Sequence, residues 1–491
     1  MTFTSVAYAI FLPIIFILYW AVPKTKRCFI LLGANVFFYM FGGPAYIILM
    51  LSIAFVTYHA AVKISLHEEE KVRKRYLAGA CIVVLFLLGF FKYADFAAGT
   101  VISLLGLFSL PMAETTLKIA LPLGISFYSF AAIGYVVDVY RNKISPEKDF
   151  IRYFDFVSFF PTVLSGPINR AEDILPLVKE PSDFDYDLAV RGLRQMLWGF
   201  FKKLIIADTL ALYSDIVFDN ATSFFGLTLI TATVFYTFQI YCDFSGYSDI
   251  ATGTAALLGI KVRDNFKSPY YSRSVKEFWS RWHISLSTWF RDYVYIPLGG
   301  SRVKEGRHYV NLMITMLLSG LWHGADWSFV IWGGLHGIYQ AAEDFCHKHL
   351  APKSIRGMKE EDIKRSTLWN IGHGILTFGL VSFAWSFFRA NNTKDAIYIA
   401  THMPRGLGHI AGSWVMMLNN MTLDGFKLAW VLILIAVLMA VDFAGRKQDI
   451  YHLFGKLPMA VRWIIYVGLT TFIIVMTING GQTQQFIYFQ F

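Results

Sequence analysis

The sequence predicts an all-α polytopic membrane protein, and composition and hydropathy are the first observations behind that fold class. Of the 491 residues, 56% are hydrophobic, 17% are aromatic and only 16% are charged. A soluble domain usually has about a quarter of its residues charged, whereas the mean hydropathy here is +0.48. These values exclude an ordinary soluble protein of this length and favour a helical bundle that spans a membrane.

Apolar runs of spanning length recur along the chain and are the third observation. The clearest runs are 5–22, 45–62, 77–91, 119–139, 225–242, 309–322, 328–342, 371–388, 428–441 and 463–478. Run 28–41 is short but is expected to span beside tilted neighbours, and run 101–112 is a candidate re-entrant segment. We therefore expect roughly eleven spans. Because no linker or internal repeat divides the sequence, one transmembrane domain is expected over residues 1–491.

Basic residues in three loops orient the bundle. These residues are Lys24, Lys26 and Arg27; then Lys63, Lys71, Arg73, Lys74 and Arg75; then Arg141, Lys143, Lys148 and Arg152. Basic loops tend to stay in the cytoplasm, so all three loops predict an N-terminus outside. The net charge of +10 is therefore expected to face anionic lipid headgroups and not nucleic acid.

Two segments depart from the pattern of spans and loops. Residues 183–208 mix basic and apolar side chains with the spacing of an amphipathic helix in the membrane interface. Residues 260–307 are too polar to span and are expected to form a cytoplasmic interfacial or re-entrant segment. Helical spacing there places four residues on one face: Phe278, Trp282, Ser285 and Trp289.

Two histidines, each preceded by tryptophan, are the candidates for proton transfer. His323 lies in SGLWHG (319–324), and His283 lies in FWSRWHIS (278–285). An ionisable group at membrane depth is costly and marks a functional-site hypothesis, and either imidazole is suited to general-base catalysis. The alternative is a structural histidine packed against tryptophan. No metal site is expected, because H-x-x-x-H and H-E-x-x-H elements are absent and the four cysteines are far apart.

A serine-hydrolase site is disfavoured. Ser245 lies between Asp243 and Asp249, but the order is not G-x-S-x-G and no strand precedes it. We expect these three side chains to cap the end of the 225–242 span and to hydrogen-bond to neighbouring helices.

Several motifs in order resemble the membrane-bound O-acyltransferase family. They are LPLGISFY (121–128), VDVYR (137–141), SFFP (158–161), SGPI (165–168), DFSGYSD (243–249), FWSRWHISLS (278–287), LWHG (321–324), WGGLHG (332–337) and FFRA (387–390). The resemblance runs almost end to end and is to the bacterial branch. That branch includes an alginate O-acetylation protein, a peptidoglycan O-acetyltransferase and, more distantly, a teichoic-acid D-alanyl transferase.

The resemblance implies a helical bundle with a central tunnel and an enzyme that transfers an acyl group across the membrane. It implies that His323 and His283 are the catalytic residues. Neighbouring side chains are expected to bind substrate, namely Trp279, Trp282, Trp322, Ser245 and Asp243. It further implies a bacterial cytoplasmic membrane protein with no bound cofactor.

The resemblance also implies the reactants. Acetyl-coenzyme A is the expected thioester donor, arriving from the cytoplasm, and the acceptor is a hydroxyl of a cell-surface or secreted polysaccharide. An extracytoplasmic transferase of the SGNH kind, or a small membrane partner, is expected to relay the group. D-alanyl transfer from a carrier protein is the alternative within the family. A transporter for a lipid-linked sugar is the alternative outside it, although no repeated halves are visible.

Overall fold

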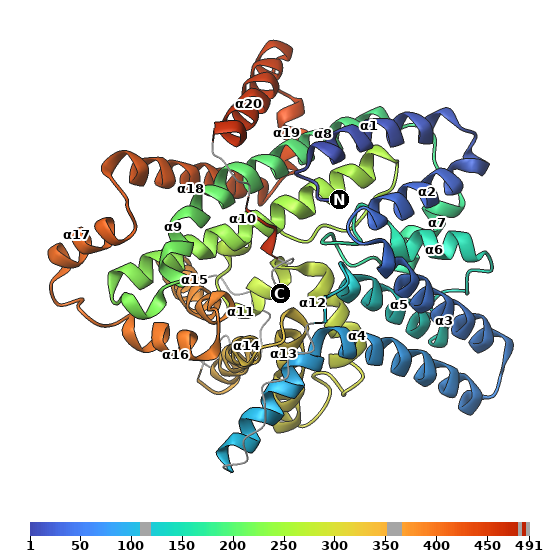
Figure 1. Ribbon diagram of the computed structural model, residues 1–491, viewed down its shortest axis with the longest axis horizontal. Coiled ribbons are helices and arrows are strands. Elements are labelled where there is room, and N and C mark those ends of the chain that lie inside the picture. Colours follow the sequence, from blue (N-terminus) through green and yellow to red (C-terminus); the bar gives the residue numbers. More distant parts are fainter. Residues whose placement is uncertain (109–118, 351–365, 480–483, 488–491) are drawn as a thin grey trace. The chain divides into compact units, whose positions relative to one another are not determined.

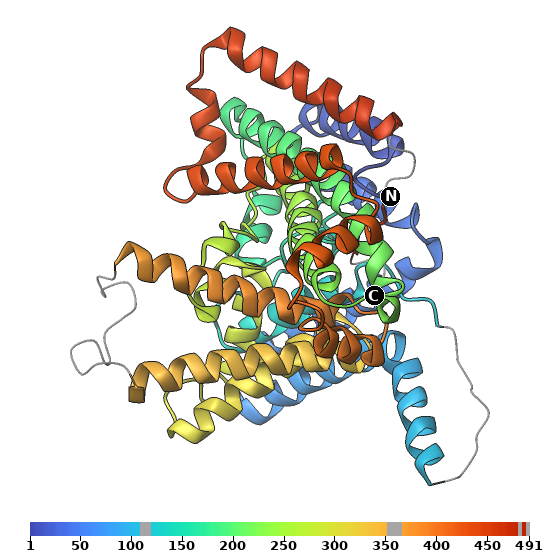
Figure 2. The ribbon, with the colours of Figure 1, turned by 90° about the vertical axis from the view of Figure 1, so that its left-hand side faces the viewer.

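The computed structural model describes residues 1–108, 119–350, 366–479 and 484–487, and within these ranges every regular element is a helix. The chain forms two compact units: residues 1–199 with 247–264, and residues 200–246 with 265–491. Figures 1 and 2 show the helices along the chain. Each unit is described by itself.

The first unit is built on a set of apolar helices. They are α1 (Val6–Ala21), α2 (Arg27–Met40), α3 (Ile47–Leu66), α4 (Glu70–Leu107), α5 (Ile125–Tyr140), α6 (Phe150–Ser158), α7 (Ala171–Lys179) and α8 (Tyr186–Phe200). Helix α3 packs against both α4 and α5. Buried polar groups tie helices together inside it, since Asn35 Nδ2 donates to Asp155 Oδ1 over 3.0 Å and the hydroxyls of Thr57 and Tyr153 lie 2.8 Å apart.

The second unit holds the rest of the helices. They are α9 (Asp208–Phe218), the first part of α10 (Leu227–Leu257), α11 (Val275–Arg281), α12 (Ile284–Phe290), α13 (Glu305–His323), α14 (Trp327–Phe345), α15 (Thr367–Arg389), α16 (Thr393–His402), α17 (Ile410–Asn420), α18 (Gly425–Gly445), α19 (Ile450–Gly455) and α20 (Met459–Asn479). Shorter π-helical turns cover Phe201–Ala207, Arg291–Tyr295 and Cys346–Leu350.

Glycines let α13 and α14 pack as a close hairpin, which Figure 2 shows as two neighbouring yellow and gold helices. A Cβ atom on Gly320 would lie 2.2 Å from the carbonyl oxygen of Phe329, and one on Gly333 would lie 2.3 Å from that of Met316. The two backbones therefore touch, as small residues allow between helices. Asp326 then caps α14 by accepting from the Ser328 amide over 2.7 Å. This hairpin fixes where His323, at the end of α13, is placed.

The close contact predicts a contrast between two adjacent glycines. Gly333→Ala is expected to destabilise the protein by about 1–3 kcal/mol, because the methyl group must push α13 and α14 apart. Gly334→Ala is the matched control, since its Cβ atom would meet only Leu317 Cδ2 at 3.6 Å. Thermal unfolding of the two purified variants measures the difference. Equal stabilities would show that the backbones are not in contact.

Five helices in the described residues are long and apolar enough to cross a membrane. They are Pro44–Leu66, Glu70–Gly106, Thr367–Arg389, Gly425–Gly445 and Met459–Asn479, with shorter apolar helices at Val6–Ala21 and Ile125–Tyr140. The all-helical class is thus confirmed, and the count of roughly eleven spans stays a prediction. Residues 101–107 continue α4, while 109–112 of the candidate re-entrant segment lie outside the described residues.

Two expectations about helix ends are wrong. Run 225–242 does not end at Asp243, because α10 continues to Leu257. Asp243, Ser245 and Asp249 therefore lie inside a helix and cap nothing, although they do hydrogen-bond to neighbouring helices as expected. Nor do Phe278 and Trp289 share one helical face, since α11 ends at Arg281 and α12 begins at Ile284.

Candidate active site

The two candidate histidines meet in the second unit. His323 ends α13, and His283 lies in the break between α11 and α12. Their ring centroids are 6.3 Å apart, and the exposed fractions of the two residues are 3% for His323 and 0% for His283. Two imidazoles that are distant in sequence are thus brought side by side, away from solvent.

His283 has an unusual backbone conformation. Its φ is 42° and its ψ is 53°, in the left-handed region, where a residue with a Cβ atom is disfavoured by about 1–2 kcal/mol. It occupies the N-cap position of α12, yet its side chain makes no capping hydrogen bond. Such strained residues cluster at functional sites when the surrounding structure holds them.

Asn265 supplies the cap that His283 does not. Its main-chain oxygen accepts from the Ile284 amide over 3.0 Å, and its side-chain Oδ1 accepts from the Ser285 amide over 3.2 Å. The Lys267 amide donates to the Arg281 carbonyl over 2.9 Å, which fixes the same segment from the other side of the break. Because the first amides of α12 are satisfied from outside, the imidazole of His283 need not bend back and can project towards His323.

Aromatic rings surround both imidazoles. The centroid of the Phe244 ring lies 4.6 Å from that of His283, and the Trp322 ring lies 5.9 Å from His283 and 4.9 Å from His323. The Trp332 and Phe388 rings lie 5.0 and 5.2 Å from His323. Burial among these groups lowers the pKa of His283 to about 3. That imidazole is therefore neutral at physiological pH.

The three tryptophans expected to bind substrate occupy different places. Trp322 borders both histidines. Trp279 donates its Nε1 hydrogen to Nδ1 of His336 over 3.2 Å, and Trp282 packs on Trp385 with centroids 5.0 Å apart. Of the three, Trp322 therefore borders both candidate catalytic imidazoles. Trp279 and Trp282 contact the aromatic wall around them, which consists of Trp332, His336, Trp385 and Phe388.

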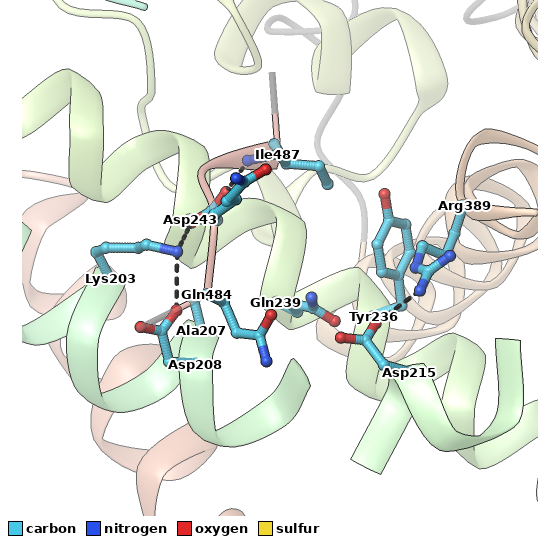
Figure 3. Close-up of a pocket in the computed structure, with 11 residues that line it drawn as sticks. Lys203, Ala207, Asp208, Asp215, Tyr236, Gln239, Asp243, Arg389, Gln484 and Ile487 are labelled. Carbon is cyan, nitrogen blue, oxygen red and sulfur yellow. Dashed lines mark hydrogen bonds and ion pairs between the residues drawn. The ribbon is translucent and has the colours of Figure 1, made fainter. Parts of the chain in front are cut away.

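Asp243 and Ser245 each contact a buried lysine, and Figure 3 shows the contacts of Asp243. The Lys203 ammonium lies 2.6 Å from Asp243 Oδ1 and 2.8 Å from Asp208 Oδ1. The Lys202 ammonium donates to Ser245 Oγ over 2.8 Å. Burial alone would lower the pKa of Lys203, but Asp243 and Asp208 together raise it above its usual value. Both lysines thus contact the motif that also contains Phe244, whose ring lies 4.6 Å from that of His283.

The prediction of an interfacial amphipathic helix over 183–208 is therefore wrong for the C-terminal end of that range. Lys202 and Lys203 have exposed fractions of 4% and 1%, so they cannot face headgroups. They lie in the π-helical turn Phe201–Ala207, and such turns are frequent at functional sites. The available signal was the run FFKKLIIA at 200–207, whose apolar residues on both sides leave no polar face for two adjacent lysines.

A small polar cavity adjoins Lys203, with Arg389 on its far side (Figure 3). Arg389 pairs with Asp215 over 2.8 Å, and the Ile487 amide donates to Asp243 Oδ2 over 2.8 Å. The cavity volume is about 40 Å³, whereas one water needs about 10–15 Å³. The cavity can hold a few waters, but not a thioester or a sugar, so substrates must reach the histidines by another path. Within the described ranges no group of three or more metal-ligating side chains occurs.

Two adjacent imidazoles that are buried among aromatic rings are chemically suited to proton transfer away from water. Residues 139–370 match the model of the MBOAT, membrane-bound O-acyltransferase, family. The probable alginate O-acetylase AlgI of Azotobacter vinelandii is 35% identical over 441 residues, which cover 89% of this chain and 84% of that protein. This chain belongs to the membrane-bound O-acyltransferase family and is an O-acyltransferase.

Other relatives extend the comparison. The peptidoglycan O-acetyltransferase of Helicobacter pylori is 35% identical over 427 residues, covering 80% of this chain and 77% of that protein. The teichoic acid D-alanyltransferase of Bacillus subtilis is 29% identical over 235 residues, covering 46% of this chain and 60% of that protein. The expected family and activity are confirmed, and family membership favours acyl transfer over transport of a lipid-linked sugar.

Proposed function

We propose that this enzyme moves an acetyl group from a cytoplasmic thioester, with acetyl-coenzyme A as the donor, to a hydroxyl of a polysaccharide outside the membrane. The observation that carries the site is the buried pair of His323 and His283, with ring centroids 6.3 Å apart. The relatives that match most of this chain are named for acetylation of alginate or peptidoglycan. They support acetyl over D-alanyl transfer.

His323 acts as the general base in this proposal. One of its ring nitrogens accepts the proton of the acceptor hydroxyl while that oxygen attacks the acyl carbonyl carbon. The bond between carbon and sulfur then breaks, and the proton passes to the departing thiolate. Positioned general-base catalysis contributes typically about 10²–10⁴-fold. The rest of the acceleration must come from alignment of donor and acceptor and from stabilisation of the oxyanion.

His283 has the complementary role. Because its imidazole is neutral, it carries one N–H that can donate a hydrogen bond to the carbonyl oxygen as negative charge develops there. The left-handed backbone and the Asn265 cap fix the ring before substrate arrives. Preorganised donors of this kind are typically worth about 10²–10³ in kcat.

Only the acyl group needs to cross the bilayer, so a narrow central tunnel suffices. The donor enters this tunnel from the cytoplasm, and the N-terminus lies outside, as the basic loops predict. A bulky polar glycan does not enter a narrow tunnel, so an external partner, a transferase of the SGNH kind or a small membrane protein, receives the acetyl group first and passes it on to the polysaccharide. No nucleic acid takes part. Trp322 lines the meeting point of the reactants, and Trp279, Trp282, Asp243 and Ser245 support it.

The donor is tested with purified protein in lipid vesicles and a radiolabelled acyl group. Acetyl-coenzyme A and a D-alanyl carrier protein are supplied separately on one side, with polysaccharide and the co-expressed external partner on the other. Label transfer from acetyl-coenzyme A alone is the expected result. Transfer from the D-alanyl carrier alone would replace acetyl by D-alanyl in the proposal.

Asn265 gives a prediction for the positioning of His283. Asn265→Leu removes the oxygen that accepts from the Ser285 amide and is expected to lower kcat by about 10²-fold, as small misplacements of catalytic groups can. Asn265→Asp retains an acceptor oxygen and is expected to keep most of the activity. Steady-state kinetics should show little change in KM for the donor. A Leu variant with unchanged kcat would remove Asn265 from the positioning of His283.

A further inference from the structure

A second pocket lies in the first unit, far along the sequence from the histidines. It has a volume of about 500 Å³ and forms where the turn between α3 and α4 meets the segment that follows α5. At its base lie the apolar residues Ile64 and Val139, which are 0% and 3% exposed and so offer almost no surface to a bound molecule. Its polar lining includes Ser65, His67, Arg73, Asn142, Lys143 and Ser145. The pocket therefore combines an apolar base with a rim rich in hydrogen-bond donors.

Arg73 is fixed in place at this rim. Its Nη2 donates to the carbonyl oxygen of Tyr140 and to Asn142 Oδ1, each over 2.7 Å, and the guanidinium lies 5.4 Å from the centroid of the Tyr140 ring. Asn142 itself has φ 56°, in the left-handed region. Nε of Arg73 is buried and has no hydrogen-bond partner among the described residues. These contacts hold the guanidinium in place at the rim.

Lys143 is the second cation of the lining. Its ammonium lies 2.7 Å from Glu172 Oε2, and Glu172 also pairs with Arg263 over 2.8 Å. Burial alone would raise the pKa of Glu172, but hydrogen bonds from Lys143 and Arg263 hold it below its usual value. Glu68 is the one carboxylate among the residues that line the pocket. The lining itself carries the two positive charges of Arg73 and Lys143 against the one negative charge of Glu68, while the carboxylates of Glu172 and Asp138, which pair with Lys143, lie outside the lining.

The position of the pocket relative to the membrane indicates which kind of molecule can reach it. Three apolar helices end there: α3 at Leu66, α5 at Tyr140, and α4, which begins at Glu70. Helices α3 and α4 are both long and apolar enough to cross a membrane, so their shared end lies at the level of the lipid headgroups. Leu66 is 68% exposed beside the pocket, which offers an apolar surface to acyl chains just below.

We propose that this pocket binds the phosphodiester headgroup of an anionic phospholipid, with Arg73 and Lys143 contacting the phosphate and the exposed Leu66 side chain meeting the acyl chains. Basic pockets between transmembrane helices on the cytoplasmic side bind such headgroups. A phosphate ester could also come from the nucleotide end of a thioester donor, but the exposed Leu66 and the position at the helix ends favour the lipid. The site is independent of the acyl-transfer chemistry.

Native mass spectrometry of the purified full-length protein tests the proposal. The protein is titrated with phosphatidylglycerol or phosphatidylcholine of identical acyl chains, and phosphatidylglycerol is expected to bind more tightly. Lys143→Gln should weaken phosphatidylglycerol binding by about five-fold, as loss of one cation near a membrane surface predicts. Lys74→Gln, the matched control, removes an exposed lysine outside the pocket lining and should change binding less than two-fold, about the limit of detection.

A second variant keeps the test decisive if loss of the Lys143–Glu172 pair disturbs the fold. Ser145→Glu adds a carboxylate at an exposed position of the lining and should weaken phosphatidylglycerol binding without removing any ion pair. Equal affinity for the two lipids, or equal effects of the lining and control variants, would overturn the proposal. Displacement of bound lipid by free coenzyme A would also overturn it, because the phosphate bound there would then belong to the donor.

Discussion

Replacing His323 by alanine is expected to lower the rate of acyl transfer by at least about 10²–10⁴-fold, the range that a positioned general base contributes. The imidazole is the proposed proton acceptor, and its ring lies buried among those of Trp322, Trp332 and Phe388. Alanine has no group that can accept the proton, and it leaves part of the space around the ring empty. The measurement is turnover of radiolabelled acetyl-coenzyme A by the purified variant, after thermal unfolding has shown that it is folded.

Two further variants separate chemistry from packing. His323→Gln fills most of the cavity and can hydrogen-bond, but it cannot accept a proton near neutral pH, so it should be nearly as inactive as alanine. His336→Gln is the control at a neighbouring buried histidine, whose Nδ1 accepts from Trp279. It should affect stability more than turnover. Full activity of a folded His323→Ala protein would remove this residue from the mechanism.

Lys203→Met is expected to destabilise the protein by about 3–5 kcal/mol, because it leaves carboxylates buried without their cation. Lys203 is the ion-pair partner of both Asp243 and Asp208, and its own exposed fraction is only 1%. The neighbouring residue Phe244 contacts His283, so activity should fall as the packing loosens. Loss of intrinsic tryptophan signal on heating measures the stability in detergent.

Variants that also remove the charges of the two carboxylates supply the control. Lys203→Met combined with Asp243→Asn and Asp208→Asn should recover much of the lost stability, because no buried charge is then left alone. Lys202→Met should cost less than Lys203→Met, because Lys203 pairs with two buried carboxylates while Lys202 donates to the neutral hydroxyl of Ser245. A Lys203→Met protein as stable as the parent would contradict the stabilising role of this ion-paired cluster.

The sequence alone was informative where local pattern and function coincide. Composition and apolar runs predicted the helical membrane class, and the motifs around His283 and His323 predicted a pair that the structure brings together. The acyltransferase family followed from the same motifs.

Non-local partners could not be read from periodicity. Regular spacing predicted one helical face through residues 278–289, but the backbone of 265–267 pairs across the break and stabilises a left-handed His283. Likewise, the prediction of an amphipathic helix over 183–208 placed Lys203 at the membrane surface, whereas the structure shows Lys203 in the interior, paired with the carboxylates of Asp208 and Asp243. Hydrophobic periodicity reports which face of a helix is apolar, and not which distant charge can neutralise a buried one.

The aromatic wall gives this enzyme an optical signal of its own. The indole rings of Trp282 and Trp332 lie 5.0 and 5.4 Å from that of Trp385, and Trp322 touches both imidazoles. Indoles this close couple electronically, and a protonated imidazole quenches the emission of an adjacent indole. Ultraviolet circular dichroism and fluorescence can therefore follow arrival of the acyl group, or charging of a histidine, in unlabelled protein.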